Sequence, residues 1–226
     1  INNACILGHG VVLLGGGHAQ IAVLKMFAMK PLPGIRLTLV TNDMRTPYSG
    51  MLPGFVEGVW DDEDLHIDLA KLAQFANARI IHASCTGIDA DHKRLLFNGH
   101  PPLRFDVLSI NIGGQPDLDA IQGANEHAIP VKPIAQFQRR LDRVISGEKT
   151  QKISVIGGGA AGCELALALS KRWLKETGER PELRLFSRSH RLLPHMAARA
   201  GRLIETDLKA IGAHIHKAVE VTKIHN

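Results

Sequence analysis

Cysteine is scarce in this chain, and its spacing gives it no evident redox or metal-binding role. The 226 residues contain three cysteines, Cys5, Cys85 and Cys163, and none of them belongs to a CxxC or CxxxxC pair. The sequence therefore gives no support to a redox dithiol or a zinc knuckle. An odd number of cysteines and the lack of a signal-peptide pattern favour a reducing, cytoplasmic location.

Aromatic residues, long apolar runs and blocks of like charge are scarce as well. Phe, Trp and Tyr make up 4% of the residues, which argues against a surface that stacks nucleic-acid bases. No apolar run approaches the length of about 18 residues that a membrane span needs, so we expect no transmembrane segment. The net charge is only +5 and the 27 Lys and Arg residues are spread along the chain, so we expect no nucleic-acid partner.

The histidines do not suggest a metal site. Of the 12 in the chain, only His214 and His216 form a close pair. They alternate along a predicted strand, where a solvent-exposed face is the simpler interpretation. We therefore predict no bound metal.

The N-terminal part of the chain has the pattern of a βαβ unit. Residues 11–14 are a continuous apolar run, typical of a strand buried on both faces of a parallel sheet. A glycine turn and a helical pattern ended by Pro31 and Pro33 follow, and residues 35–40 form a second strand. The pattern then predicts a turn-rich loop at 41–54, a helix at 68–77, a strand at 79–84, an antiparallel meander at 86–105, a strand at 106–114 and a helix at 134–146.

The βαβ pattern restarts after the polar segment 147–152. Strands at 153–156 and 183–186 flank a helix at 160–177, and a helix at 197–211 and a strand at 213–219 follow. We therefore predict an α/β fold with two Rossmann-like units, parallel sheets and a small antiparallel meander. The domains are predicted to be 1–148 and 149–226.

Each predicted unit has a glycine turn between its first strand and its first helix. The second turn has the complete pattern Gly157-x-Gly159-x-x-Gly162. The first glycine allows a sharp bend, the second lets a phosphate approach the backbone, and the third lets the helix pack closely on the strand. The free N–H groups at the start of the helix then face the anion. Between a strand and a helix, this pattern predicts a dinucleotide site, with a plain tight turn as the alternative.

The first turn is less complete. Gly15 and Gly17 fit the pattern, but Gln20 stands at the third position. We therefore expect the first helix to pack less closely on its strand, or to lie slightly farther from it.

The residues after the second strand of each unit bear on the adenosine ribose, which an acidic residue usually holds. The first unit has Thr41 and Asn42 there, and the second has Ser187 followed by Arg188 and Arg191. An arginine attracts a 2′-phosphate, whereas a carboxylate would repel it. The sequence therefore favours NADPH over NADH, with a role in surface solvation as the alternative for both arginines.

Several separated segments resemble a known family, the two-dinucleotide-binding flavoproteins of the pyridine nucleotide–disulfide oxidoreductase class. The segment GGGAAGCELA resembles the NAD-domain signature of type II NADH dehydrogenases. GGGHAQ, TPYSGMLPGFVEG, HIDLAKLA, DVLSINIGGQP and AIPVKPIAQF resemble the FAD-containing, NADH dehydrogenase-like domain that is fused to bacterial selenophosphate synthetase. The resemblance covers nearly the whole chain.

The resemblance implies two sets of cofactor contacts. For FAD they are Gly15, Gly17, His18, Ala19 and Gln20 at the pyrophosphate, Thr41 and Asn42 at the ribose, Cys85 at the adenine, Tyr48, Ser49 and Gly50 along the flavin, Gly113 at a strand end and Lys132 near the reduced flavin. For NAD(P)H they are Gly157, Gly159, Ala160, Ala161, Gly162, Glu164, Ser187, Arg188 and Arg191. The alternatives are an ordinary Pro–Gly surface loop around Tyr48 and a surface role for Lys132.

The chain also departs from the family. Members that reduce disulfides carry a cysteine pair just after the first unit, and TPYSGMLPG stands in that region without one. Cys163 lies inside the second glycine turn, where a small packing residue is the simpler interpretation. The chain begins without Met and stops at Asn226, before the family's last FAD strand and interface domain, so we expect a truncated fragment.

The resemblance implies an FAD-dependent NAD(P)H oxidoreductase. Hydride would pass from the nicotinamide to the flavin, and electrons would then reach a small-molecule acceptor such as a quinone or a selenium compound. A selenophosphate synthetase domain in the parent chain is an expected partner. No residue is assigned as catalytic, because hydride transfer needs no protein acid or base. The alternatives are a non-catalytic dinucleotide-binding or sensor module, and a dehydrogenase with one cofactor whose first glycine turn is only structural.

Overall fold

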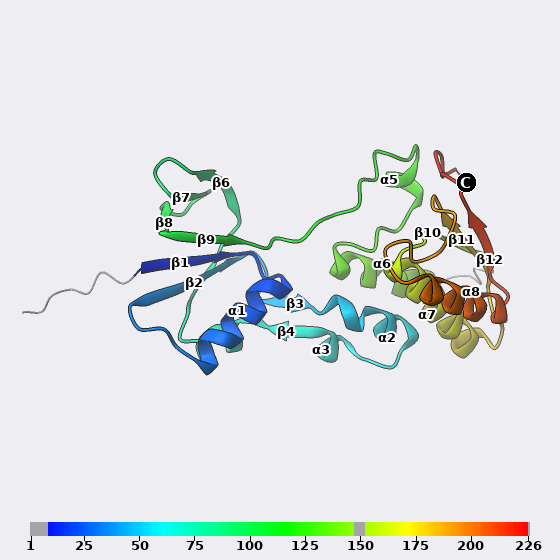
Figure 1. Ribbon diagram of the computed structural model, residues 1–226, viewed down its shortest axis with the longest axis horizontal. Helices are drawn as coiled ribbons and strands as arrows, with labels where there is room; N and C mark the ends of the chain where they lie inside the picture. Colours follow the sequence, from blue (N-terminus) through cyan, green and yellow to red (C-terminus); the bar gives the residue numbers. More distant parts are fainter. Residues whose placement is uncertain (1–8, 147–151, 226) are drawn as a thin grey trace, which may run out of the picture. The chain divides into compact units, whose positions relative to one another are not determined.

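The structure is a computed structural model that describes residues 9–146 and 152–225 (Figure 1). The chain forms two units. Unit 1 consists of Ile1–Tyr48 and His66–Gly114, and unit 2 of Ser49–Leu65 and Gln115–Asn226. The predicted boundary between residues 148 and 149 falls in 147–151, outside the described residues, and stays a prediction. The inclusion of Ser49–Leu65 in unit 2 is not evident from the sequence pattern.

Unit 1 is built on a four-stranded parallel sheet in the order β5-β2-β1-β9. Its strands are β1 (His9–Leu14), β2 (Ile35–Thr41), β5 (Arg79–His82) and β9 (Val107–Ile110). At the end of β1, Leu14 is paired with Val40 of β2 on one side and with Ile110 of β9 on the other. The predicted α/β class with a parallel sheet is thus confirmed.

Helices and a small antiparallel sheet cover the two faces of this parallel sheet (Figure 1). On one face, α1 (His18–Met29) and α4 (Leu69–Phe75) pack around Leu24, Leu39 and Leu69, which are all fully buried. On the other face, β6 (Cys85–Asp89), β7 (Arg94–Phe97) and β8 (Leu103–Arg104) form the predicted meander, whose Leu95 packs with Val40. The pattern did not predict the short antiparallel pair of β3 (Arg45–Pro47) and β4 (His66–Asp68).

Unit 2 contains a three-stranded parallel sheet in the order β10-β11-β12. Its strands are β10 (Lys152–Ile156), β11 (Glu182–Ser187) and β12 (His214–Lys217). The helices α7 (Ala160–Thr177) and α8 (Ala198–Ala210) pack on one face around Cys163, Leu185 and Leu208. These elements confirm the second predicted βαβ pattern.

The other side of α7 packs against α6 (Ile134–Ser146) and α2 (Leu52–Glu57). The prediction of a loop through residue 54 is wrong from Leu52 onward, because Leu52 and Val56 are buried with Trp173 of α7 and Pro53 stands in the first turn of α2. Glu57, the last residue of α2, forms an ion pair with Lys171 of α7 at 3.0 Å. The remaining short helices of unit 2 are η1 (Ser49–Met51), α3 (Asp62–Leu65) and α5 (Ala124–His127).

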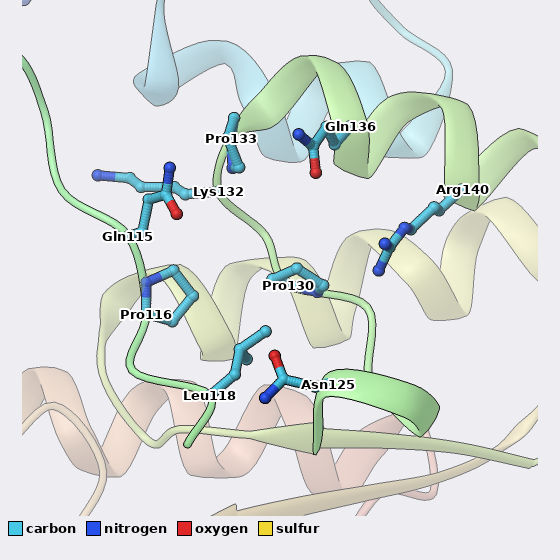
Figure 2. A pocket seen from close by; sticks show the side chains of 9 residues that line it. All are labelled: Gln115, Pro116, Leu118, Asn125, Pro130, Lys132, Pro133, Gln136 and Arg140. Carbon is cyan, nitrogen blue, oxygen red and sulfur yellow. The ribbon is translucent and has the colours of Figure 1, made fainter. Parts of the chain in front are cut away.

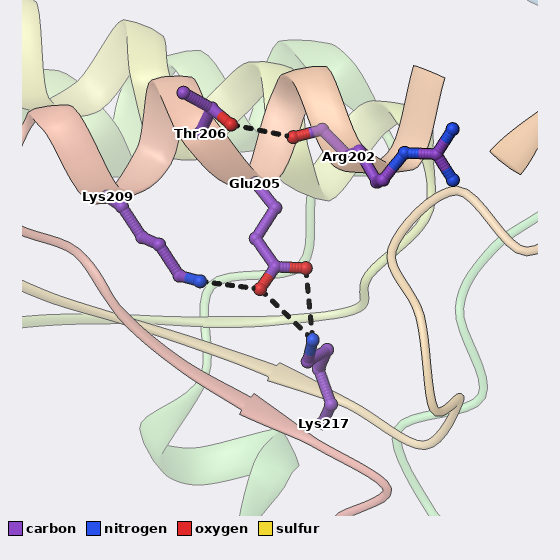
Figure 3. A network of polar contacts seen from close by, with 5 residues as sticks. All are labelled: Arg202, Glu205, Thr206, Lys209 and Lys217. Carbon is purple, nitrogen blue, oxygen red and sulfur yellow. Dashed lines mark hydrogen bonds and ion pairs between the residues drawn. The ribbon is translucent and has the colours of Figure 1, made fainter. Parts of the chain in front are cut away.

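Glu205 joins α8 to β12 (Figure 3). Its carboxylate accepts hydrogen bonds from Lys209, one turn farther along α8, at 2.9 Å and from Lys217 of β12 at 3.0 Å. The bonds from Lys209 and Lys217 hold the pKa of Glu205 below its ordinary value. This network fixes the last strand of the sheet to its covering helix.

Candidate functional site

The first glycine turn joins β1 to α1 in unit 1. Gly15 has a φ of +94°, and its N–H donates to the carbonyl of Val40 at 2.8 Å. A Cβ on Gly15 would lie closer than 3.0 Å to the backbone of Asn111, just beyond β9. Glycine is therefore required here both by the left-handed backbone and by the neighbouring strand.

The start of α1 offers backbone N–H groups to an anion. Gly17 is the N-cap, no side chain caps the helix, and His18 and Ala19 form the first turn. A helix of 12 residues places partial positive charge at this end. The ring of Tyr48 contacts the ring of His18 edge-on, with centroids 4.9 Å apart. Tyr48, predicted beside the flavin, thus lies beside the start of α1.

Gln20, which replaces the third glycine, attaches α1 to β9. Its side chain is fully buried, and its Nε2 donates to the carbonyl and to the hydroxyl of Ser109, each at 3.0 Å. The Ser109 hydroxyl can also donate to Gln20 Oε1 at 3.3 Å. A buried amide therefore attaches α1 to the neighbouring strand at this position. The expected looser packing of this helix stays a prediction.

Asn111 is a residue of this turn that the sequence analysis missed. Its backbone N–H donates to Leu14 at 2.8 Å, and its carbonyl accepts from the N–H of Gly17 at 3.1 Å. A Cβ on Gly17 would collide with the Asn111 carboxamide, Oδ1 first. The space over the second glycine of the first turn is thus filled by a side chain from 94 residues farther along the chain.

The predicted adenosine contacts have mixed surroundings. Thr41 is buried, and its hydroxyl donates to the carbonyl of Asp43 at 2.9 Å, so it stabilises the end of β2. The side chain of Asn42 is exposed, and the Asn42 carbonyl bonds to His82 Nε2 at 2.9 Å. Cys85 is half-buried, and its thiol donates to the carbonyl of Gly87 at 3.2 Å. Their roles at the ribose and adenine stay predictions.

Three further predicted flavin contacts are exposed. Gly113 has a φ of +79°, and a Cβ there would meet no atom within 4 Å, so the strand end is open to a ligand. Ser49 and Gly50 lie in η1 of unit 2, where both are exposed. Their contact with the flavin stays a prediction.

Lys132 is also exposed, at the rim of an open cavity of about 160 Å³ within unit 2 (Figure 2). The lining residues are Gln115, Pro116, Leu118, Asn125, Pro130, Lys132, Pro133, Gln136 and Arg140. In Figure 2 the Lys132 amine points away from the Arg140 guanidinium. The predicted place of Lys132 near the reduced flavin is untested.

The second glycine turn joins β10 to α7 in unit 2. Gly157 has a φ of +127°, and its N–H donates to the carbonyl of Phe186 on β11 at 2.8 Å. A Cβ on Gly162 would collide with the carbonyl oxygen of Gly157, which is the close helix–strand approach that the pattern predicts. A Cβ on Gly159 would meet no atom within 4 Å. The second turn therefore has open space where a phosphate is expected to approach.

The start of α7 has backbone N–H groups that an anion in this open space could reach. Gly159 is the N-cap, no side chain caps the helix, and Ala160 and Ala161 form the first turn of an 18-residue helix. Small side chains leave the N–H groups accessible, and the helix dipole favours an anion. Glu164 lies in the next turn and is exposed. Backbone groups alone could hold a pyrophosphate here.

The middle glycine of this turn, Gly158, also matters, and the pattern did not indicate it. A Cβ on Gly158 would collide with the side chain of Ser187, which is buried at the end of β11. The Ser187 hydroxyl accepts from the N–H of Ser189 at 3.2 Å, and the carbonyl of Gly158 accepts from Leu193 at 2.8 Å. The side chain of Ser187 therefore leaves room only for glycine at position 158.

Arg188 and Arg191 follow β11, and both are exposed. Arg188 lies 3.6 Å from the carboxylate of Glu220, and Arg191 donates to the carbonyl of Pro194. An exposed ion pair of this length is weak, so the Arg188 guanidinium can take another partner at little cost. Arg188 is thus available to a phosphate, whereas Arg191 is exposed but bonded to the Pro194 carbonyl.

Cys163 has the surroundings of a packing residue. Its side chain is fully buried, and its thiol lies 3.7 Å from the carbonyl of Gly158. Burial and then the nearby Glu164 carboxylate raise the pKa of the thiol to about 11. A reactive thiolate is therefore disfavoured at neutral pH.

The described residues contain neither a candidate metal cluster nor a candidate membrane-spanning helix. Across 9–146 and 152–225, no group of three or more His, Cys, Asp or Glu side chains could hold a metal ion. In the same part of the chain, no helix combines the length and apolar character needed to cross a membrane.

Comparisons with known proteins place this geometry in a wider group. A family model described as pyridine nucleotide-disulphide oxidoreductase matches residues 9–226. The demethylphylloquinone reductase NdbB of Synechocystis sp. is 29% identical over 150 residues, covering 63% of this chain and 36% of that protein. The rubredoxin-NAD(+) reductase of Alcanivorax borkumensis is 27% identical over 226 residues, covering 96% and 55%. The chain therefore spans only part of the length of these relatives.

Solved structures share the fold at low sequence identity. NDH2 from Plasmodium falciparum in complex with NADH has a TM-score of 0.82 and 15% identity, covering 96% of this chain and 49% of that chain. The water-forming NADH oxidase from Lactobacillus brevis bound to NADH has a TM-score of 0.77 and 20% identity, covering 97% and 48%.

Proposed function

This chain belongs to the pyridine nucleotide-disulphide oxidoreductase family, and from that premise we propose that it binds FAD at its first glycine turn and NAD(P)H at its second. The geometry of the second glycine turn gives this proposal its main support. There Gly162 lies against the backbone of Gly157, just after β10, Gly159 faces open space, and α7 begins without a side-chain cap. These are the three properties that a backbone site for a pyrophosphate requires.

The first turn also fits a dinucleotide, by different means. Gly15 makes the bend, and the uncapped start of α1 supplies N–H groups. Gln20 and Ser109 hold the start of α1 against β9 in place of a third glycine. The open backbone at Gly113 leaves room for a ligand beside the strand end.

The proposed activity is that of an FAD-dependent NAD(P)H oxidoreductase. When bound, FAD supplies the group that accepts hydride from NAD(P)H and passes electrons onward. The chain's own residues bind and orient the two cofactors. The starts of α1 and α7 hold anionic groups, and in the second turn the glycines also keep the backbone close to the anion. None of these roles requires a protein acid or base.

A preference for NADPH over NADH is part of the proposal. Arg188 and Arg191 stand exposed just after β11, where the adenosine ribose is expected. A charge-assisted hydrogen bond contributes about 1.5–3 kcal/mol, so losing one should weaken NADPH binding roughly 10- to 150-fold. We expect Arg188→Ala and Arg191→Ala to weaken NADPH binding and leave NADH binding unchanged.

Titration calorimetry with both nucleotides measures this preference. Arg184→Ala is the matched control, because Arg184 lies on β11 itself and is paired with Glu182. Equal losses for NADH and NADPH in the Arg188 and Arg191 variants would contradict the assignment.

The electron acceptor we propose is a quinone, with a selenium compound as the second candidate. The name of the Synechocystis relative, demethylphylloquinone reductase, supports a quinone. The sequence resemblance to the domain fused to selenophosphate synthetase supports a selenium compound and that synthetase as a partner. Cysteine usage supports a cytoplasmic location.

One experiment separates the proposal from its alternatives. The full-length protein is purified, and its visible spectrum is recorded anaerobically before and after addition of NADPH or NADH. Loss of a flavin band on addition supports the oxidoreductase. A flavin band that neither nucleotide bleaches would favour the sensor module. A protein that binds NAD(P)H but cannot be loaded with FAD would favour the dehydrogenase with one cofactor.

A further inference from the structure

The two glycine turns share a sequence pattern but differ over the second glycine. At Gly159, the direction of a Cβ is open for 4 Å. At Gly17, the same direction is occupied by the carboxamide of Asn111. The first turn therefore does not present bare backbone at this point, and a ligand there would meet a side chain first.

The backbone fixes the place of Asn111 from two sides. Its N–H bonds to Leu14 of β1 at 2.8 Å, and its carbonyl bonds to the N-cap Gly17 at 3.1 Å. The residue is half-buried, and among the described residues none hydrogen-bonds to its side chain. A polar carboxamide thus stands at the start of α1 with its bonding capacity unused by the protein.

The orientation of the carboxamide assigns the exposed donor. Oδ1 and Cγ are the atoms nearest to the Cβ position of Gly17, whereas Nδ2 is not among the three nearest atoms. A carbonyl oxygen over the Cα–H of glycine is a favourable weak contact, whereas an amide N–H there would face another hydrogen. Nδ2 therefore lies farther from Gly17 than Oδ1 does, and this donor is left to meet a ligand at the turn.

We propose that Asn111 binds the first dinucleotide directly, with Nδ2 donating a hydrogen bond to the pyrophosphate at the start of α1. This inference rests on the proposed function, since it assigns a contact within the proposed FAD site. The carboxamide replaces the direct approach of the phosphate to Gly17 that its own position prevents. A neutral donor suits this place, because a carboxylate would repel the phosphate and compete for the helix dipole.

The test measures FAD affinity in the full-length protein by quenching of flavin fluorescence. Asn111→Ala removes the donor, and we expect FAD binding to weaken at least tenfold. Asn111→Asp keeps the side-chain volume and adds negative charge, so a larger loss is expected, and higher salt should diminish it. Asn98→Ala, at an exposed turn of unit 1, is the matched control and should bind FAD like the wild type.

A second readout separates contact from a merely structural role. NAD(P)H binding and the melting temperature of the apoprotein should be unchanged in all three variants. If Asn111→Ala does not fold, Asn111→Asp carries the test alone, because its shape is that of the wild type.

Wild-type affinity for FAD in Asn111→Ala would overturn the inference and leave the proposed function intact. Tighter FAD binding in Asn111→Ala would also overturn it, by showing that the carboxamide obstructs the site. A wild-type protein that binds NAD(P)H and no FAD would overturn both the inference and the FAD half of the proposed function.

Discussion

Substitution of Gly162 by alanine tests the packing of the second turn. Alanine is favoured over glycine inside a helix by about 1 kcal/mol, so propensity alone predicts a more stable protein. The structure predicts the opposite, because the new methyl group would collide with the carbonyl oxygen of Gly157. Gly157 cannot retreat easily, since its N–H is bonded to Phe186 of β11.

The cost of the collision and the gain in helix propensity have opposite signs, so their sizes decide whether Gly162→Ala destabilises the protein. Overpacking typically costs about 1–3 kcal/mol, and a collision with backbone belongs at the upper end. After the gain in helix propensity, we expect Gly162→Ala to lower the free energy of unfolding by about 1–2 kcal/mol. For a chain of this size, that corresponds to a fall in melting temperature of about 2–8 °C.

Gly159→Ala is the matched control. Its φ of −81° and ψ of −178° suit alanine, and its Cβ would enter open space. We expect a loss of only about 0.5 kcal/mol from the poorer N-cap, but at least a tenfold loss of NAD(P)H affinity. Thermal unfolding and nucleotide titration of both variants measure the difference. A Gly162→Ala protein that melts at or above the wild-type temperature would refute the packing argument.

Three further predictions concern Gln20, Cys163 and Glu205. Gln20→Leu leaves the carbonyl and hydroxyl of Ser109 without their partner, so we expect the free energy of unfolding, measured with denaturant, to fall by about 1–3 kcal/mol. The control Gln74→Leu, at an exposed position, should change stability little. Equal effects of the two substitutions would contradict the role of the buried amide. With a pKa of about 11, Cys163 should be about one part in a thousand thiolate at pH 8. Mass spectrometric mapping after brief alkylation should therefore find Cys85 modified and Cys163 intact. Rapid modification of Cys163 in the native protein would be inconsistent with its burial. The pKa of Glu205 is lowered in the folded protein, so its ion pairs stabilise the fold by about 1 kcal/mol above the pKa of the unfolded carboxyl. This contribution is lost as the pH falls through the folded pKa, so Glu205→Gln should be less stable than the wild type near pH 7 and less sensitive to acid. Parallel pH–stability curves for the two proteins would argue against this role of Glu205.

The periodic parts of the chain were predictable, because their signals are local. The apolar runs of β1, β2, β10 and β11 and the glycine turns gave the two parallel sheets. The collision of a Gly162 Cβ with Gly157 follows from a pattern only six residues long.

What the sequence could not supply depends on distant partners. Gln20 meets Ser109, which is 89 residues away, so nothing near Gln20 indicates how it replaces a glycine. Asn111 likewise reaches Gly17 only because β9 pairs with β1. The helix α2 forms in a turn-rich segment because Leu52 and Val56 bury against α7, a contact that local propensity does not encode.

The proposed function requires the two glycine turns to hold two different dinucleotides, FAD and NAD(P)H. An anaerobic titration tests it most directly: the full-length protein is loaded with FAD, freed of excess cofactor and titrated with NADPH while its visible spectrum is recorded. We expect one bound flavin per chain and complete loss of its visible band with one equivalent of NADPH. A protein that retains no flavin, or whose flavin neither NADPH nor NADH reduces, would contradict the assignment of FAD and NAD(P)H to the two turns.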